Sequence, residues 1–157
     1  MKVVLLAIGK TNEQYLIDGI SKYQRRLQHY IQFEIFELPN IRNTKNFSDS
    51  ELKKKEGEVI LKQLKSSDYV VLLDDKGQCF TSLAFSKRIQ TWRLSGKKRL
   101  LFVIGGAYGF SEDVYNRGDE RLSLSKMTFS HQMVRLFFAE QIYRGYTILH
   151  NEPYHHE

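Results

Sequence analysis

Cysteine, proline and long apolar runs are all scarce in this sequence of 157 residues. Cys79 is the only cysteine, so no disulfide can form within the chain, and a reducing compartment fits best. With only 2 prolines, the chain has no proline-rich segment. No apolar run approaches the roughly 20 residues that span a bilayer. We therefore expect a cytoplasmic protein with no membrane segment.

Several familiar reactive motifs are missing as well. There is no Cys-x-x-Cys pair and no His-Glu-x-x-His run, so nothing indicates a metal site. The turn after the first apolar run, Gly9-Lys10-Thr11, lacks the glycine cluster of a dinucleotide-binding loop. NAD and ATP are therefore weak candidates for a ligand.

The composition is that of a compact globular protein. Hydrophobic residues make up 41% of the chain, and a single domain over residues 1–157 is expected. Its 24 basic and 18 acidic residues give a formal charge of +6. This moderate excess favours an anionic partner such as nucleic acid, but it does not require one.

Short apolar runs alternate with helical patterns along the chain. The runs predict strands over residues 3–8, 33–38, 69–73, 100–104 and 122–124. Helices are expected after caps at Asn12, Ser48, Thr81 or Ser82, and Ser111, and the last near Ser130. Strands that alternate with helices indicate an α/β fold with a parallel sheet.

Two charged segments have ordinary structural interpretations. Asp74 and Asp75 lack a third ligand at suitable spacing, so residues 74–77 are predicted to form a turn rather than a metal or acid-base site. Lys53-Lys54-Lys55 is surrounded by acidic residues that include Glu56 and Glu58. We interpret this segment as a solvated helix face with local ion pairs.

Two further stretches are predicted to build one small-molecule pocket. The run 100–104 leads directly into Gly105, Gly106 and Gly109, and glycines allow a backbone to turn sharply beside a ligand. Residues 122–131 alternate polar and apolar side chains and open onto the last helix. Open α/β sheets bind ligands at the carboxyl ends of their strands, where both stretches are expected. A purely structural turn is the alternative for the glycines.

The last helix is apolar around most of its circumference. Its apolar residues are Met133, Val134, Leu136, Phe137, Phe138, Ile142, Tyr143 and Tyr146. One small sheet does not cover so much apolar surface, so a second, symmetric copy of the chain is expected to bury part of it. Glu140 and Arg144 lie four residues apart on this helix, which predicts an intrahelical ion pair.

Four motifs in one order resemble the RlmH family, small bacterial SPOUT-class methyltransferases that act on a pseudouridine of 23S ribosomal RNA. The motifs are Phe102-Val103-Ile104-Gly105-Gly106 with Gly109, Leu124-Ser125-Lys126-Met127-Thr128-Phe129-x-His131, Ala139-Glu140-Gln141-Ile142-Tyr143-Arg144, and Pro153-Tyr154-His155. The resemblance implies a parallel sheet flanked by helices, with a carboxyl-terminal trefoil knot that periodicity alone does not predict. It also implies a homodimer that binds S-adenosylmethionine and acts on the large subunit or the assembled ribosome.

The resemblance also carries residue roles onto this chain. Cofactor contacts are expected at Leu73, Gly105, Gly106, Gly109, Leu124, Ser125, Lys126, Met127, Thr128 and Phe129. RNA contacts are expected at Arg135, Glu140, Arg144, Tyr154, His155 and His156. The chain departs from the family pattern at Ser130, where relatives commonly have proline, and at His156, where they often have a firmly basic residue.

The reaction implied is methylation of N3 of the pseudouridine, which must lose a proton. His131 is the first candidate for the base and His155 the second, because histidines titrate near neutrality. Two alternatives remain open on the sequence. One is a ribosome-binding or assembly factor without turnover, and the other is a small-molecule enzyme that uses a different nucleotide.

Overall fold

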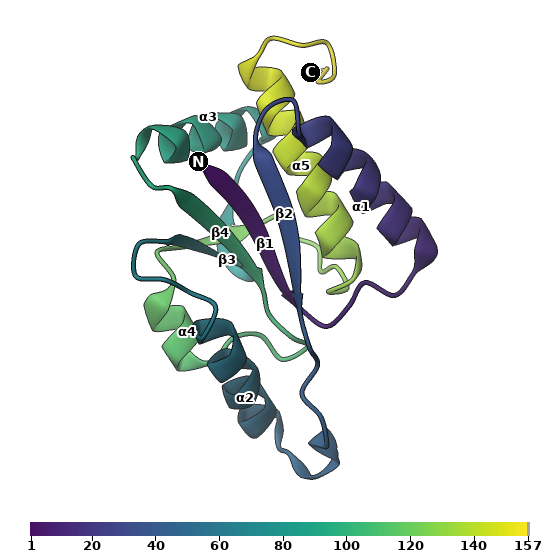
Figure 1. The fold of residues 1–157 in the computed structure, drawn as a ribbon, viewed down its shortest axis with the longest axis vertical. Helices are drawn as coiled ribbons and strands as arrows, with labels where there is room; N and C mark the ends of the chain where they lie inside the picture. Colours follow the sequence, from purple (N-terminus) through teal and green to yellow (C-terminus); the bar gives the residue numbers. More distant parts are fainter. Residues whose placement is uncertain (157) are drawn as a thin grey trace.

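The computed structural model describes residues 1–156, in which strands alternate with helices (Figure 1). The strands are β1 (Lys2–Ile8), β2 (Gln32–Leu38), β3 (Tyr69–Cys79), β4 (Arg99–Ile104) and β5 (Glu120–Ser123). The helices are α1 (Gln14–Leu27), α2 (Asp49–Leu61), α3 (Ser82–Leu94), α4 (Glu112–Arg117) and α5 (Met133–Leu149), with a short 3-10 turn, Thr44–Asn46, before α2.

All five strands join one parallel sheet in the order β2-β1-β4-β3-β5. β1 shows why its continuous apolar run forms a central strand. Val3, Leu5 and Ala7 pack into the core on one face, and Val4, Leu6 and Ile8 pack into the core on the other. A strand with both faces buried reads as an uninterrupted apolar segment. The predicted α/β fold with a parallel sheet is therefore confirmed.

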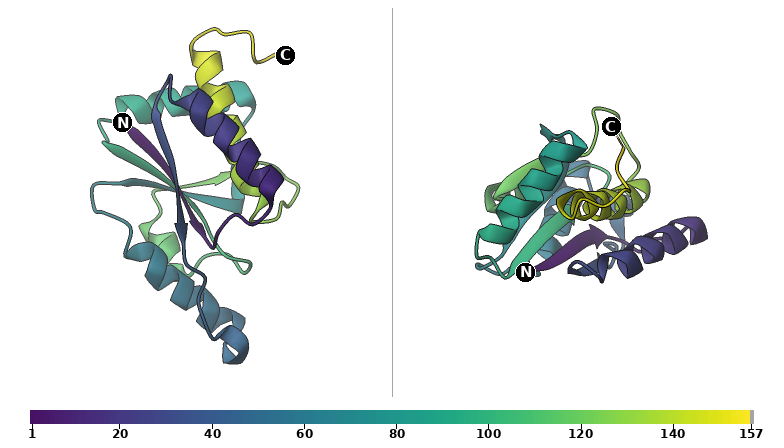
Figure 2. Two further views of the ribbon diagram at one scale, coloured as in Figure 1. Left: turned by 45° about the vertical axis from the view of Figure 1, so that its right-hand side comes forward. Right: turned by 90° about the horizontal axis from the view of Figure 1, so that it is seen from above.

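The helices form a layer on each face of the sheet (Figures 1 and 2). α1, α3 and α5 cover one face, where Trp92 of α3 and Phe138 of α5 pack around Phe102 of β4. α2 and α4 cover the other, with Ile60 and Val114 buried against the sheet. The neighbouring strands β3 and β4 thus lead into helices on opposite faces. Such a divergence opens a crevice at the carboxyl ends of the two strands.

The predicted helix starts are correct in three cases and wrong in one. Ser48 begins α2 with a capping box to Glu51, and the Thr81 hydroxyl accepts from the N–H of Ala84 at the start of α3. Ser111 caps α4. The predicted Asn12 cap is wrong, because α1 begins after Glu13 with no side-chain cap. The N–H of Asn12 instead donates to Gln132 Oε1 at 3.0 Å.

Residues 74–77 do not form the predicted turn. β3 continues to Cys79, and both Leu73 and Gln78 lie opposite Leu122 of β5, so the four residues between them bulge out of the ladder. Gly77 fits here because a Cβ at this position would lie 2.6 Å from the carbonyl carbon of Leu122. Pairing with β5, which lies far along the chain, therefore overrides the local tendency of Asp-Asp-Lys-Gly to turn.

α5 packs between α1 and α3 and keeps part of its apolar surface outside the chain's own core. Phe138, Ile142 and Tyr146 are buried, whereas Phe137 is 38% exposed. Among residues 1–156, no helix is both long enough and apolar enough to cross a membrane. The carboxyl-terminal trefoil knot stays a prediction.

Candidate functional site

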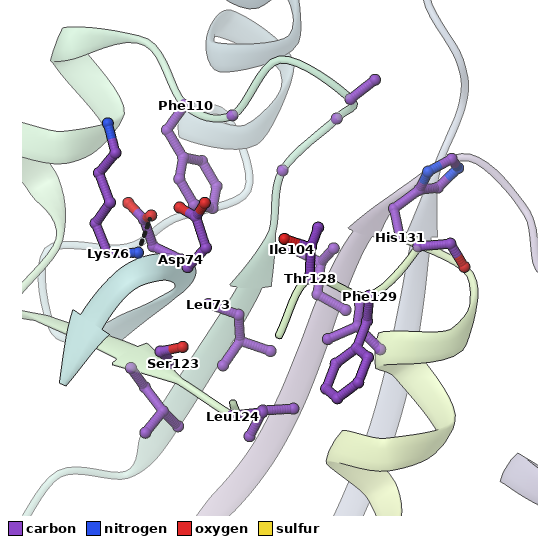
Figure 3. A pocket seen from close by; sticks show the side chains of 18 of the residues that line it. Leu73, Asp74, Lys76, Ile104, Phe110, Ser123, Leu124, Thr128, Phe129 and His131 are labelled. Atoms are coloured by element: carbon purple, nitrogen blue, oxygen red, sulfur yellow. Dashed lines mark hydrogen bonds between the residues drawn. The ribbon is translucent and has the colours of Figure 1, made fainter. Parts of the chain in front are cut away.

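A cavity of about 590 Å³ lies at the carboxyl end of β4 and beside the bulge that follows Leu73 of β3 (Figure 3). Its volume is in the usual range for small-molecule sites. Three segments supply most of its lining, namely residues 73–76, 104–110 and 122–131. The two stretches that the sequence singled out therefore lie on the same cavity, together with the bulge of β3.

The first wall is residues 105–109, here called the glycine corner. Gly109 has a φ of +84°, a conformation that favours glycine, and its N–H donates to the carbonyl of Gly106 at 3.2 Å. Gly106 and Gly109 pair as an isolated antiparallel bridge, and within residues 1–156 the backbone N–H groups of residues 107 and 108 donate no hydrogen bond. The corner thus presents backbone donors that a ligand can use.

The second wall is the segment between β5 and α5. The hydroxyl of Ser123 donates to the carbonyl of Ser125 at 2.7 Å, and Ser125 Oγ accepts from the N–H of Met127 at 2.9 Å. These two bonds curl the chain so that Leu124 and Phe129 point toward the cavity (Figure 3). The Phe129 ring also stacks on Phe137 of α5, at 4.7 Å between centroids.

His131 stands just before the start of α5, across the cavity from the bulge of β3 (Figure 3). α5 begins at Met133 after Gln132, and the hydroxyl of Ser130 accepts from the N–H of Met133 at 3.1 Å, just before the helix. His131 is exposed and lines the cavity. Of the predicted cofactor residues, only Lys126 does not line it, and its side chain is exposed to solvent.

Asp74 lines the cavity, although its sequence context predicts only a turn at residues 74–77. Asp74 Oδ1 accepts from the N–H of Lys76 at 3.0 Å, and Oδ2 is buried without a hydrogen-bond partner among the described residues. Burial tends to raise the pKa of Asp74, but the bond from Lys76 and the nearby Tyr115 hydroxyl lower it below its ordinary value. Burial and Asp74 together raise the pKa of Tyr115 to about 12. The cavity therefore holds a fixed negative charge.

Arg135 is predicted to contact RNA, and the structure shows that this prediction is wrong. Its side chain is fully buried, and its guanidinium donates to the carbonyls of Ile8 at 2.8 Å and Gly9 at 2.9 Å. Glu37 lies 3.5 Å from Arg135 Nη1. Burial lowers the pKa of Arg135. Arg135 joins the end of β1 to α5, and its side chain is not exposed for contact with a nucleic acid.

The other predicted RNA residues lie on α5 from its middle, at Glu140, onward and on the tail that follows it. Glu140 and Arg144 form the expected ion pair, and the hydroxyl of Tyr154 donates to Glu140 Oε1 at 3.1 Å. Arg144 Nη1 lies 3.3 Å from His155 Nδ1, so the tail folds back on its own helix, while His156 is exposed. α5 has 17 residues and is about 25 Å long. The tail therefore lies far from His131 of the same chain.

Glu56 is buried, although the charge pattern around residues 53–55 predicts a solvated helix face. It is only 7% exposed, and the ion pair on that face joins Lys55 to Glu58. Among residues 1–156, no three His, Cys, Asp or Glu side chains come together as metal ligands do.

The fold and the cavity define a class of protein. The chain belongs to the family described as predicted SPOUT methyltransferases, whose model matches residues 1–155. It is similar to the ribosomal RNA large subunit methyltransferase H of Parabacteroides distasonis, at 57% identity over 157 residues and 100% of both chains. The proteins of the same name from Christiangramia forsetii and Flavobacterium johnsoniae are 57% and 54% identical, over 99% and 100% of both chains. The resemblance found in the motifs is confirmed.

The similarity to a solved structure supports the fold and does not bear on the function. The tRNA (m1G37) methyltransferase from Aquifex aeolicus superposes with a TM-score of 0.52, over 92% of this chain and 70% of that chain. The sequences are 14% identical. A likeness at this distance concerns the arrangement of the sheet and its helices and carries no information about the substrate.

Proposed function

We propose that this protein is a cytoplasmic, homodimeric, single-domain methyltransferase that uses S-adenosylmethionine to methylate N3 of a pseudouridine in 23S ribosomal RNA. The observation that carries the proposal is the cavity at the carboxyl end of β4 and the bulge of β3, which gathers the glycine corner, Leu124 to Phe129 and His131. The relatives named for the methylation of large-subunit ribosomal RNA supply the substrate class.

The residues of the cavity fit S-adenosylmethionine. Leu73, Leu124 and Phe129 offer apolar walls for an adenine ring. The N–H groups of residues 107 and 108, which donate no bond among the described residues, are donors for its polar edge or its ribose. Asp74 supplies the negative charge that suits a cationic ligand. When bound, the cofactor supplies the methyl group on its sulfonium. The protein has mainly to hold the cofactor and the RNA base and to orient them toward one another.

His131 is the residue we assign to proton removal. It reaches the cavity from the start of α5 and is exposed to a substrate that enters from solvent. In this assignment, an imidazole nitrogen of His131 accepts the N3 proton of the pseudouridine as the methyl group is transferred. The buried bonds of Arg135 and the bond that the Ser130 hydroxyl accepts fix the helix start that carries His131.

In a homodimer, the tail of one copy can contact RNA beside the cavity of the other copy, whereas it is directed away from the cavity of its own chain. Tyr154 and His155 contact Glu140 and Arg144, which lie 9 and 13 residues after His131, or about 14 and 20 Å along the helix. A second copy packed on the exposed apolar part of α5, which includes Phe137, can bring its own tail toward this cavity. Arg144, Tyr154, His155 and His156 would then contact RNA beside a cofactor held by the partner.

The proposal is tested by transfer of a radiolabelled methyl group from S-adenosylmethionine to ribosomes that lack the modification, with fully modified ribosomes as the control. We expect label only in the unmodified 23S RNA, on a pseudouridine. Ribosome binding without label would favour an assembly factor on the same fold. Absence of a thermal shift with S-adenosylmethionine would favour an enzyme that uses a different nucleotide.

A further inference from the structure

Glu56 of α2 lies directly behind the glycine corner. A Cβ at Gly106 would lie 2.5 Å from Glu56 Oε1 and closer still to Oε2. Gly106 does not have a positive φ, so the backbone conformation is not the reason for a glycine here. The carboxyl group of Glu56 occupies the space that a side chain at position 106 would need.

α2 supports the other end of the same loop through the next residue. A Cβ at Gly57 would lie 3.1 Å from Ser111 Cβ and 3.3 Å from Val114 Cγ2. Ser111 in turn caps α4, where its hydroxyl accepts from the N–H of Val114. Glu56 and Gly57 therefore contact the loop between β4 and α4 near its beginning and at its end.

The carboxyl group of Glu56 is unpaired in this position. Oε2 is buried without a hydrogen-bond partner among the described residues, and burial raises the pKa of the group. The N–H groups of residues 107 and 108 in the adjoining corner donate no bond either among the described residues. Unsatisfied buried polar groups are rare in native proteins, and they often mark a functional site. Across residues 1–156, the Glu56 carboxyl group is thus a hydrogen-bond acceptor without a donor, and it lies next to a glycine corner whose N–H groups at residues 107 and 108 have no acceptor.

We propose that Glu56 is a positioning residue for cofactor binding. Its carboxyl group holds the glycine corner in the shape that receives S-adenosylmethionine and accepts a hydrogen bond from a corner N–H once the cofactor is bound. Glu56 acts through the corner, because it contacts Gly106 and does not line the cavity itself. This inference rests on the proposed function.

The test compares Glu56→Leu, which keeps the volume of the side chain, with Glu56→Gln, which keeps a hydrogen-bonding group. Glu58→Leu is the matched control, because Glu58 is exposed on the same helix. Isothermal titration with S-adenosylmethionine should show binding weakened at least about fivefold in Glu56→Leu. Glu56→Gln should stay within about threefold of the wild type, and Glu58→Leu should be unchanged.

Two further readouts separate positioning from a structural role. In methyl transfer to unmodified ribosomes, Glu56→Leu should raise the KM for S-adenosylmethionine while kcat at saturation stays near the wild-type value. Its cofactor-free melting temperature should be equal or higher, since an unpaired buried oxygen has been removed. Wild-type affinity in Glu56→Leu would overturn the inference and leave the proposed function standing. A wild-type protein that binds no S-adenosylmethionine would overturn both.

Discussion

The guanidinium of Arg135 donates to the carbonyl of Ile8 at 2.8 Å, a bond that joins residues 127 positions apart. A second bond, to Gly9, and a third, to the Thr11 hydroxyl, extend this junction. The last helix is thereby fixed to the end of the first strand at the point where His131 enters the cavity.

Removal of this junction should destabilise the whole protein. We expect Arg135→Ala to lower the free energy of unfolding by about 3 kcal/mol or more, because buried carbonyls lose their donors and Glu37 loses its partner. Urea denaturation monitored by circular dichroism measures the change. Arg25→Ala, at an exposed position of α1, is the control and should stay within about 0.5 kcal/mol. A loss as small as that control would show that the junction contributes little.

The proposed base gives a second prediction. His131→Ala should reduce methyl transfer to unmodified ribosomes about 100-fold or more, because proton removal loses its acceptor. Affinity for S-adenosylmethionine should change little. His29→Ala is a suitable control, since His29 is exposed near the amino end of β2 and far from the cavity. Turnover near the wild-type rate would remove His131 from the mechanism.

The lowered pKa of Asp68 leads to a prediction of how the free energy of unfolding depends on pH. Burial tends to raise its pKa, but bonds from the Arg99 guanidinium and the N–H of Lys65 lower it below the ordinary value of about 3.9. A carboxyl group whose pKa is lowered by folding stabilises the protein above its unfolded pKa. That stabilisation is lost as the pH falls through the folded pKa.

Denaturant titrations between pH 2 and pH 7 should therefore show a fall in stability below about pH 4. Asp68→Asn should be less stable at pH 7 and should show a shallower fall, because the titrating group is gone. Asp18→Asn, at an exposed site on α1, should follow the wild-type curve. Parallel curves for Asp68→Asn and the wild type would contradict the assignment.

The contact between Gly106 and Glu56 leads to a prediction that can be tested on the stability of the cofactor-free protein. Gly106→Ala should cost about 1–3 kcal/mol, because its Cβ meets the Glu56 carboxyl group. In a Glu56→Ala background, the same substitution should cost less than half as much. Gly109→Ala is the contrasting case, since its cost comes from the positive φ and should not depend on Glu56. Equal costs of Gly106→Ala in both backgrounds would refute the steric explanation.

Much of the fold could be predicted from local patterns. After their first residues, Lys2 and Arg99, β1 and β4 are apolar because both faces are buried, and Ser48 with Glu51 forms the capping box that its spacing indicates. The bulge at residues 74–77 could not be predicted, because pairing with β5 shapes it across a long stretch of chain.

The wrong predictions for Arg135 and Glu56 have the same cause, because contacts with residues far along the chain decide where these side chains lie. Arg135 and Glu56 are of charged residue types that are usually exposed, so sequence alone places them in solvent, but both are buried. Their environments are set by Ile8 and Gly106, which are distant along the chain. The glycine corner and residues 124–129 could be placed on one cavity because strand ends of a parallel sheet meet at one edge.

The position of β5 at the edge of the sheet has a consequence for synthesis of the protein. Until residues 120–123 leave the ribosome, β3 has a bare outer edge and nothing to close the cavity beside Leu73. On the proposed function, a nascent chain acquires affinity for S-adenosylmethionine only after residues 122–131, which supply much of the cavity lining, have been translated. From then on, ligand binding draws the newly made polypeptide toward the native state by mass action.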